Sequence, residues 1–184
     1  MTQNLVPYTL YEVGIKSLEL NLTSGITYQF PETLANGRAN YIVFEELIRK
    51  ITGLVKAKNS DHQDGNGITY EQKAFKDPAI YPKAKDDLFQ TSASNTFGAN
   101  NKGPVIKKLL EAGNYQDALE ICKATGYDHN DFYIYTNTKQ YKVSFPLRYF
   151  VAPKADVLAN LTSHDPRLVD RRNLLSKITQ TVTL

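Results

Sequence analysis

Glu71 and Lys73 are the residues of this chain whose types and spacing best suit catalysis, because they place one acid and one amine two positions apart. The sequence around them, ITYEQKAF, predicts a strand over residues 68–75. Side chains alternate between the two faces of a strand, so both should project from the same face and share one site. No other acid in the chain stands two residues before a lysine. The alternative interpretation is an exposed ion pair of little energetic value.

Two aspartates precede this strand, Asp61 and Asp64, the second in a Gly-containing turn predicted over residues 64–67. If either carboxylate reaches the face of Glu71, the two acids can hold a hard divalent cation such as Mg²⁺, with the backbone carbonyl of Gln72 as a further oxygen ligand. Such a site suits phosphodiester hydrolysis, because the metal neutralises charge on the phosphate while the neighbouring ammonium positions the attacking water. Both aspartates are candidate metal ligands, and the number of metal ions stays open.

The segment before this turn and strand is expected to form a helix that holds them in place. Apolar residues recur close to helical spacing between residues 40 and 58, which predicts an amphipathic helix there. Its acids Glu45 and Glu46 are candidates for a further acid at the site, and a solvated position is the alternative for at least one of them. The histidines show no zinc-like spacing with one another or with the cysteine. His62 stands beside the acidic turn and could approach the metal site, but a surface position is the favoured interpretation.

The order of helix, acidic turn and strand with Glu-x-Lys resembles the PD-(D/E)XK nuclease superfamily. Within it, the stretch over residues 41–75 is most similar to type II restriction endonucleases of the PvuII kind. These show an aspartate ten residues before the glutamate, a Gly-containing turn, a tyrosine before the glutamate and a lysine two after it, a pattern matched by Asp61, residues 64–67, Tyr70, Glu71 and Lys73. The family's proline before the aspartate is missing from both candidates, so Asp61 is favoured by spacing alone and Asp64 remains in competition.

The resemblance implies a restriction-endonuclease-like fold for residues 1–184, in the α/β (α+β) class, as a single domain with a central mixed β-sheet flanked by helices and a catalytic core at about 40–76. It also implies a Mg²⁺-dependent endodeoxyribonuclease that cuts double-stranded DNA at a specific site in a prokaryotic cytoplasm, without an organic cofactor. Lys73 would position the attacking water. A two-fold symmetric target favours a homodimer in which each subunit cuts one strand.

Two regions are candidates for DNA contacts. Residues 76–104 lack periodicity and follow the proposed catalytic strand, and their polar run contains Asn95, Asn100, Asn101 and Lys102, side chains that can bond base edges or phosphates. Residues 139–177 carry eight basic and three acidic groups, and the apolar spacing over 167–178 predicts a basic amphipathic helix. Its arginines, Arg167, Arg171 and Arg172, would contact phosphates or face a dimer partner. Polar surface loops and solvated faces are the alternatives.

The remaining patterns predict further elements around one sheet. They are helices from Pro104 to Gly113 and over 115–126, a central strand over 132–138, another over 142–152, and short β-prone pieces over 16–30. A lone Cys122 excludes an internal disulfide and a cysteine zinc site and suits a reducing compartment. The chain shows neither a signal-peptide pattern at its start nor an apolar run of the ~20 residues that a membrane span needs.

Two other functions stay open on the sequence. A DNA repair or Holliday-junction nuclease of the same superfamily would prefer branched substrates over linear duplex. A non-catalytic DNA-binding or partner-binding module would use Glu71 and Lys73 as a structural pair. Such a pair should give no gain in DNA affinity with Mg²⁺ or Ca²⁺.

Overall fold

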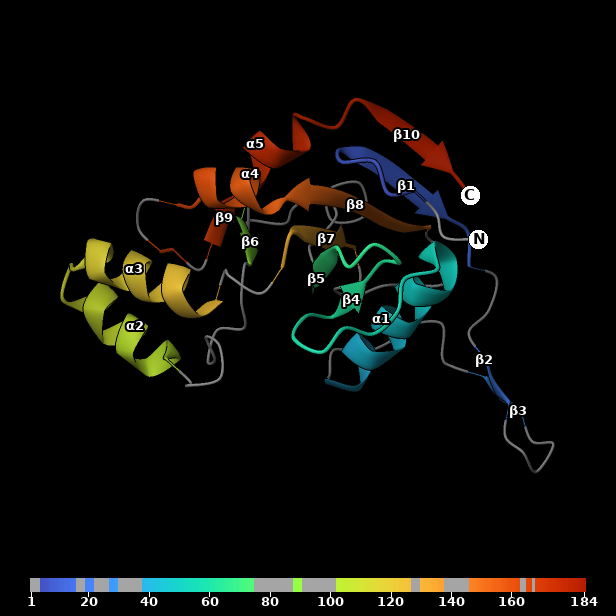
Figure 1. The fold of residues 1–184 in the computed structure, drawn as a ribbon, viewed down its shortest axis with the longest axis horizontal. Helices are drawn as coiled ribbons and strands as arrows, with labels where there is room; N and C mark the ends of the chain where they lie inside the picture. Colours follow the sequence, from blue (N-terminus) through green and yellow to red (C-terminus); the bar gives the residue numbers. More distant parts are fainter. Residues whose placement is uncertain are drawn as a thin grey trace.

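A computed structural model shows a mixed six-stranded sheet with helices packed around it (Figure 1). It describes residues 4–15, 19–21, 27–29, 38–74, 88–90, 102–126, 130–137, 146–162, 165–166 and 168–184. The strand order is β10-β1-β8-β7-β5-β4. These strands are β1 (Thr9–Val13), β4 (His62–Gln63), β5 (Thr69–Ala74), β7 (Phe132–Thr136), β8 (Leu147–Pro153) and β10 (Gln180–Thr183).

Two small antiparallel pairs of strands accompany this sheet. One joins β2 (Glu19–Asn21) to β3 (Thr27–Gln29), and the other joins β6 (Leu88–Gln90) to β9 (Leu168–Asp170). The helices are α1 (Arg38–Thr52), α2 (Gly103–Glu111), α3 (Tyr115–Gly126), α4 (Lys154–Ala159) and α5 (Arg171–Leu175). The expected mixed sheet flanked by helices is therefore confirmed.

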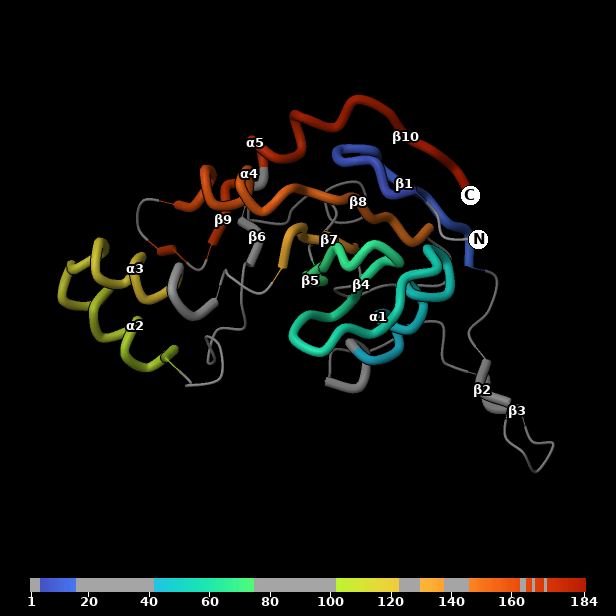
Figure 2. Tube along the Cα trace, in the orientation of Figure 1, coloured from blue at the N-terminus to red at the C-terminus, as the bar shows by residue number. Residues whose placement is uncertain are grey.

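The pairing of strands makes β7 the centre of the part of the sheet that carries the candidate site. It runs parallel to β5 and antiparallel to β8, and its last four residues are buried. At the opposite edge, β1 and β10 lie side by side in parallel although they come from opposite ends of the chain (Figure 2). The predicted central strand over 132–138 is confirmed by β7, and the strand expected over 142–152 is confirmed from Leu147 onward.

Hydrophobic side chains fill both faces of the sheet. On one face, Phe44 and Ile48 of α1 pack against Tyr70 and Ile134. On the other face, a cluster that includes Tyr133, Tyr135 and Phe150 meets side chains from α4 and α5. The predicted pair of helices, α2 and α3, forms a third cluster that includes Cys122 and packs against leucines that follow β8.

The first helix is shorter than its apolar pattern predicts. It ends at Thr52, six residues before the expected end at 58, and Gly53 follows with φ 75°. Glycine adopts this left-handed conformation without the steric penalty that a Cβ brings, so it ends the helix. Val55 then pairs with Gln63 across the chain, which starts the hairpin instead of another helical turn.

The predicted C-terminal helix over 167–178 is wrong. Leu168–Asp170 forms β9 and pairs with β6, and the helix that follows is only five residues long. The Asp170 side chain accepts a hydrogen bond from the Arg172 N–H and so begins α5 where the pattern had predicted its interior. In the part of the chain that the structure describes, no helix has the length and apolar character needed to cross a membrane.

Candidate functional site

Asp64 stabilises the turn between β4 and β5. Its Oδ1 accepts hydrogen bonds from the N–H groups of Asn66 and Ile68, at 2.8 and 2.9 Å. Gly67 follows with φ 87°, a conformation that a tight turn needs and that favours glycine. The predicted turn is therefore confirmed, and the Asp64 carboxylate oxygen that makes these bonds is committed to it.

Asp61 lies beside the strand that carries Glu71 and Lys73. Its Oδ2 accepts a hydrogen bond of 2.7 Å from the backbone N–H of Gln72. The pairing of β4 with β5 ends at His62 and Tyr70, so extending the register by one residue sets Asp61 opposite Glu71, on the same face. The structure thus brings Asp61 to the position that its spacing predicts.

This contact also locates the backbone carbonyl of Gln72. In a strand, the N–H and C=O of one residue point toward the same side. Because the Gln72 N–H points to Asp61, its carbonyl faces the same edge of β5, beyond the end of β4. One carboxylate and one carbonyl therefore meet beside β5, beyond the end of the two-residue strand β4.

Glu71 and Lys73 share one face of β5, as the alternation of the strand predicts. Lys73 Nζ donates to Glu71 Oε1 at 2.5 Å, and both side chains are partly buried, at 17% and 28% exposed. Their partners across the parallel pairing with β7 are Tyr133 and Tyr135, both fully buried. These buried tyrosines shield the ion pair from water on one side. The pair therefore differs from the fully exposed ion pair that is the alternative to a catalytic role.

The two helix acids differ in environment. Burial raises the pKa of Glu45, and the nearby charges of Asp61 and Glu71 raise it further, against the lowering effect of Arg49. Glu46 is 58% exposed, and a hydrogen bond that it accepts from Arg49 lowers its pKa. Glu45 is therefore the helix acid whose pKa responds to the charges of Asp61 and Glu71.

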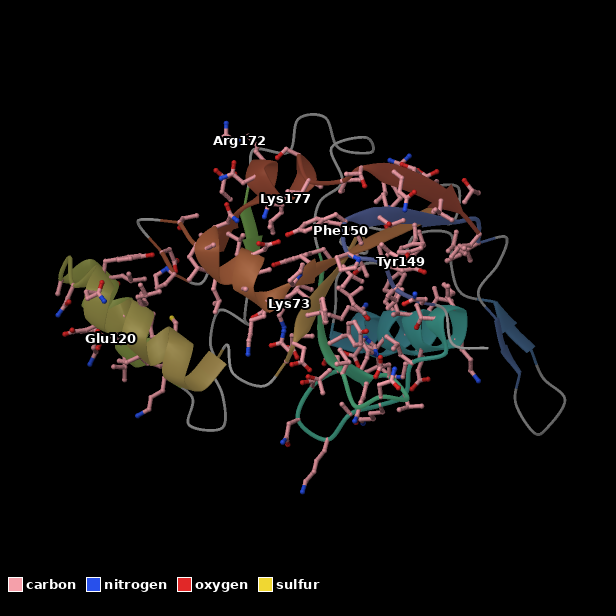
Figure 3. All side chains as sticks on the ribbon, turned by 45° about the horizontal axis from the view of Figure 1, so that its top comes forward. Lys73, Glu120, Tyr149, Phe150, Arg172 and Lys177 are labelled. Atoms are coloured by element: carbon pink, nitrogen blue, oxygen red, sulfur yellow. The ribbon has the colours of Figure 1, made fainter. Side chains whose placement is uncertain are left out.

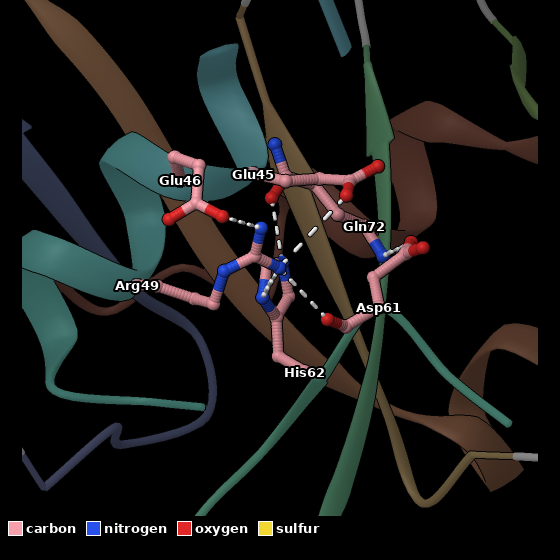
Figure 4. A network of polar contacts seen from close by, with 6 residues as sticks. All are labelled: Glu45, Glu46, Arg49, Asp61, His62 and Gln72. Atoms are coloured by element: carbon pink, nitrogen blue, oxygen red, sulfur yellow. Dashed lines mark hydrogen bonds and ion pairs between the residues drawn. The ribbon is translucent and has the colours of Figure 1, made fainter. Parts of the chain in front are cut away.

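A buried polar network lies behind these acids (Figure 4). Arg49 is 8% exposed; its Nη1 donates to the backbone oxygen of Asp61 at 3.1 Å and to His62 Nδ1 at 3.4 Å. His62 Nε2 donates to Gln72 Oε1 at 2.7 Å. Burial, more than any charge around it, lowers the pKa of His62 to about 4, so the imidazole is neutral at pH 7. The expected surface position of His62 is wrong.

Part of this network can be predicted from the spacing of charged residues in α1. Arg49 stands four residues after Glu45 and three after Glu46, spacings that bring side chains together on a helix. His62 follows Asp61, so alternation sends it to the opposite face, toward α1. Their joint burial depends on how α1 packs against the hairpin, which sequence spacing does not define.

The donor set fits a hard cation such as Mg²⁺. Asp61, Glu71 and the Gln72 carbonyl offer oxygen ligands. The charges of Asp61 and Glu71 add to the burial that raises the pKa of Glu45, and a divalent cation would offset their effect. Among the described residues, no three Asp, Glu, His or Cys side chains are already arranged as a complete metal cage. Mg²⁺ commonly uses only one or two carboxylates and keeps several waters.

Comparison of the chain with protein-family models, with curated proteins and with solved structures gives no match.

The proposed DNA-contact residues lie apart from this site or outside the described residues. Asn95, Asn100, Asn101 and Arg167 fall outside them, and for Arg171 only the backbone is described. Lys102 precedes α2, and Arg172 is 75% exposed and projects outward from α5, whereas Lys73 lies near the middle of the molecule (Figure 3).

Proposed function

We propose that this chain is a Mg²⁺-dependent endonuclease that hydrolyses phosphodiester bonds of duplex DNA, with a restriction-endonuclease-like fold and the activity of a type II restriction enzyme. The observation that carries the proposal is the 2.7 Å hydrogen bond from the Gln72 N–H to the Asp61 carboxylate. This bond brings Asp61 close to Glu71 and Lys73. The three residues together match the sequence pattern of the PD-(D/E)XK nuclease superfamily.

Each residue of the site has a role that its position supports. Asp61, Glu71 and the Gln72 carbonyl would hold the cation, with Glu45 as a nearby acid. A bound Mg²⁺ ion would supply positive charge against the phosphate and lower the pKa of the attacking water. Lys73 would orient that water and stabilise the negative charge that develops on the phosphate, because its ammonium lies 2.5 Å from a proposed ligand and is mostly screened from solvent.

Asp64 has no metal role in this proposal. Its Oδ1 already bonds two backbone N–H groups of the turn, and these contacts hold the hairpin that positions Asp61. A homodimer in which each subunit cuts one strand remains part of the proposal, since duplex cleavage at a symmetric target needs two sites.

The test is incubation of the purified chain with a long, sequence-diverse duplex DNA, with Mg²⁺ or with EDTA. Wild type should give discrete bands that require Mg²⁺, and Glu71→Gln should give none. Glu111→Gln is the matched control, because Glu111 also pairs with a lysine, at 3.7 Å, but is 64% exposed on α2; it should cleave like wild type.

Other results would select another function. Cleavage of a four-way junction without cleavage of linear duplex would favour the repair-nuclease alternative. Duplex binding without cleavage of either substrate, and without a gain from Mg²⁺ or Ca²⁺, would contradict the proposal and favour the binding module. Unchanged cleavage by Glu71→Gln would refute the assignment of the site.

A further inference from the structure

Arg49 and His62 are too deeply buried to be explained as ordinary surface polar residues. Arg49 is 8% exposed and His62 is fully buried, between α1 and the β4–β5 hairpin. A guanidinium and an imidazole in such a place destabilise the fold unless specific partners compensate, and well-packed apolar residues commonly serve stability as well or better. Their presence therefore calls for a task that apolar side chains do not perform.

Apart from the bond of Arg49 Nη2 to Glu46 at 2.7 Å, the side-chain hydrogen bonds of these two residues lead to Asp61 by two routes. On the first, Arg49 Nη1 donates directly to the Asp61 backbone oxygen at 3.1 Å. On the second, Arg49 Nη1 donates to His62 Nδ1, and His62 Nε2 donates to the Gln72 side chain. The backbone N–H of the same Gln72 then donates to the Asp61 carboxylate. One end of the network thus fixes the Asp61 backbone, and the other fixes its side chain.

The network also determines where Gln72 stands. Gln72 lies on the α1 face of β5, opposite the face of Glu71 and Lys73, because strand residues alternate. Its side chain anchors to His62, at 2.7 Å, while its backbone contacts Asp61. A shift of His62 would therefore be transmitted through Gln72 to the backbone between the two proposed catalytic residues.

We propose that Arg49 and His62 are positioning residues that hold Asp61 and Gln72 in the geometry that binds the divalent cation. This inference rests on the proposed function, because it takes Asp61 and the Gln72 carbonyl as metal ligands. Neither residue touches the cation or the DNA. Outer partners of this kind commonly change metal affinity about 10- to 100-fold when they are removed.

The first test measures Ca²⁺ binding to the full chain by calorimetry, without DNA and without turnover. His62→Leu removes both hydrogen bonds of the imidazole and should weaken Ca²⁺ binding about 10- to 100-fold. His62→Gln retains a donor for Gln72 and should recover most of the loss. Arg148→Met is the control, because it removes a partly buried arginine that pairs with Glu12 at 2.6 Å between β1 and β8, away from the site; its Ca²⁺ affinity should stay within about twofold.

The second test reads the position of Asp61 directly, through amide hydrogen exchange. In His62→Leu, the Gln72 N–H should exchange at least about tenfold faster, because its acceptor is no longer held. The Gln63 N–H, which bonds the Val55 carbonyl at 2.8 Å in the same hairpin, should exchange within about twofold of its wild-type rate. Loss of protection at both amides alike would indicate general loosening and would overturn the positioning role.

The outcomes separate this inference from the function on which it rests. Wild type that binds no Ca²⁺ would overturn the proposed metal site, and the positioning role with it. Wild type that binds Ca²⁺, together with His62→Leu that binds it equally well, would overturn the positioning role alone. If His62→Leu does not fold, Arg49→Lys carries the same expectation, because lysine keeps the charge but lacks the planar guanidinium whose Nη2 bonds Glu46 while its Nη1 bonds Asp61 and His62.

Discussion

The burial of His62 makes the stability of the fold depend on pH. In the unfolded chain a histidine titrates with a pKa near 6.5, whereas burial in the native state lowers the pKa of His62 to about 4. Between about pH 6.5 and pH 4, the imidazole of His62 is therefore protonated in the unfolded chain but largely neutral in the native state. Stability must fall as the pH drops through this window, and the loss levels off only below the folded pKa, at about 4.

The size of the effect follows from the two pKa values. Between pH 7 and pH 5, the difference in proton binding at this one imidazole lowers the free energy of unfolding by about 2 kcal/mol. Between pH 7 and pH 4 the loss grows to about 3 kcal/mol. The nearby charges act in both directions, since Arg49 opposes protonation whereas Glu71 and Glu46 favour it, and burial is the larger influence. A domain of this size has a free energy of unfolding of about 5–15 kcal/mol, so the loss is measurable.

The assay is urea denaturation at pH 7 and pH 5, in EDTA, for wild type and His62→Gln. Glutamine does not titrate and keeps a donor for Gln72. Between pH 7 and pH 5, the free energy of unfolding should therefore fall by about 2 kcal/mol less in the variant than in wild type. The carboxylates and the other two histidines are common to both proteins and cancel in the comparison. A difference between the two proteins of less than about 0.5 kcal/mol would refute the neutral, buried histidine.

Three further predictions concern the residues of the proposed site. Lys73→Ala should abolish cleavage while Ca²⁺-dependent DNA binding persists in a gel-shift assay; cleavage at the wild-type rate would contradict its role. Asp61→Asn should lower the cleavage rate at least about 100-fold, whereas Asp64→Ala should retain cleavage but lower the free energy of unfolding by about 1–3 kcal/mol, because its two turn N–H groups lose a charged acceptor. The reverse pattern would exchange the two assignments. If six or more phosphates are neutralised, DNA affinity should fall about a thousandfold between 50 and 200 mM salt, and a flat salt dependence in a binding titration would contradict DNA as the partner.

Local patterns predict the hairpin and its neighbouring helix well. The Gly-containing turn, the alternation through Tyr70 and Glu71, and the apolar spacing of α1 are all signals that act over a few residues. The same holds for α2 and α3, where Pro104 stands at the start of a helix and Gly126 at an end. Each of these elements begins close to where the sequence predicts it, because interactions among its own residues favour it, although α1 ends six residues early.

The elements that the sequence misses depend on partners far along the chain. Leu168 and Val169 fit a helical pattern, but they pair with β6, about 80 residues earlier. Strands β1 and β10 stabilise each other from opposite ends of the chain, and neither has a strong pattern alone. The same reason hides His62, whose burial comes from α1 packing against the hairpin. Long-range pairing overrides propensity at these positions.

The short hairpin also imposes a parity rule on the site. In this antiparallel pairing His62 opposes Tyr70, so partners across the hairpin are always separated by an even number of residues, as Asp61 and Glu71 are. Removal of one residue from the turn would set Asp61 against Tyr70 or Gln72 and bring His62 onto the face of Glu71. Only insertions or deletions of an even number of residues can keep an acid opposite an acid. The length of this turn is therefore constrained by the chemistry of the site as tightly as the identity of its residues.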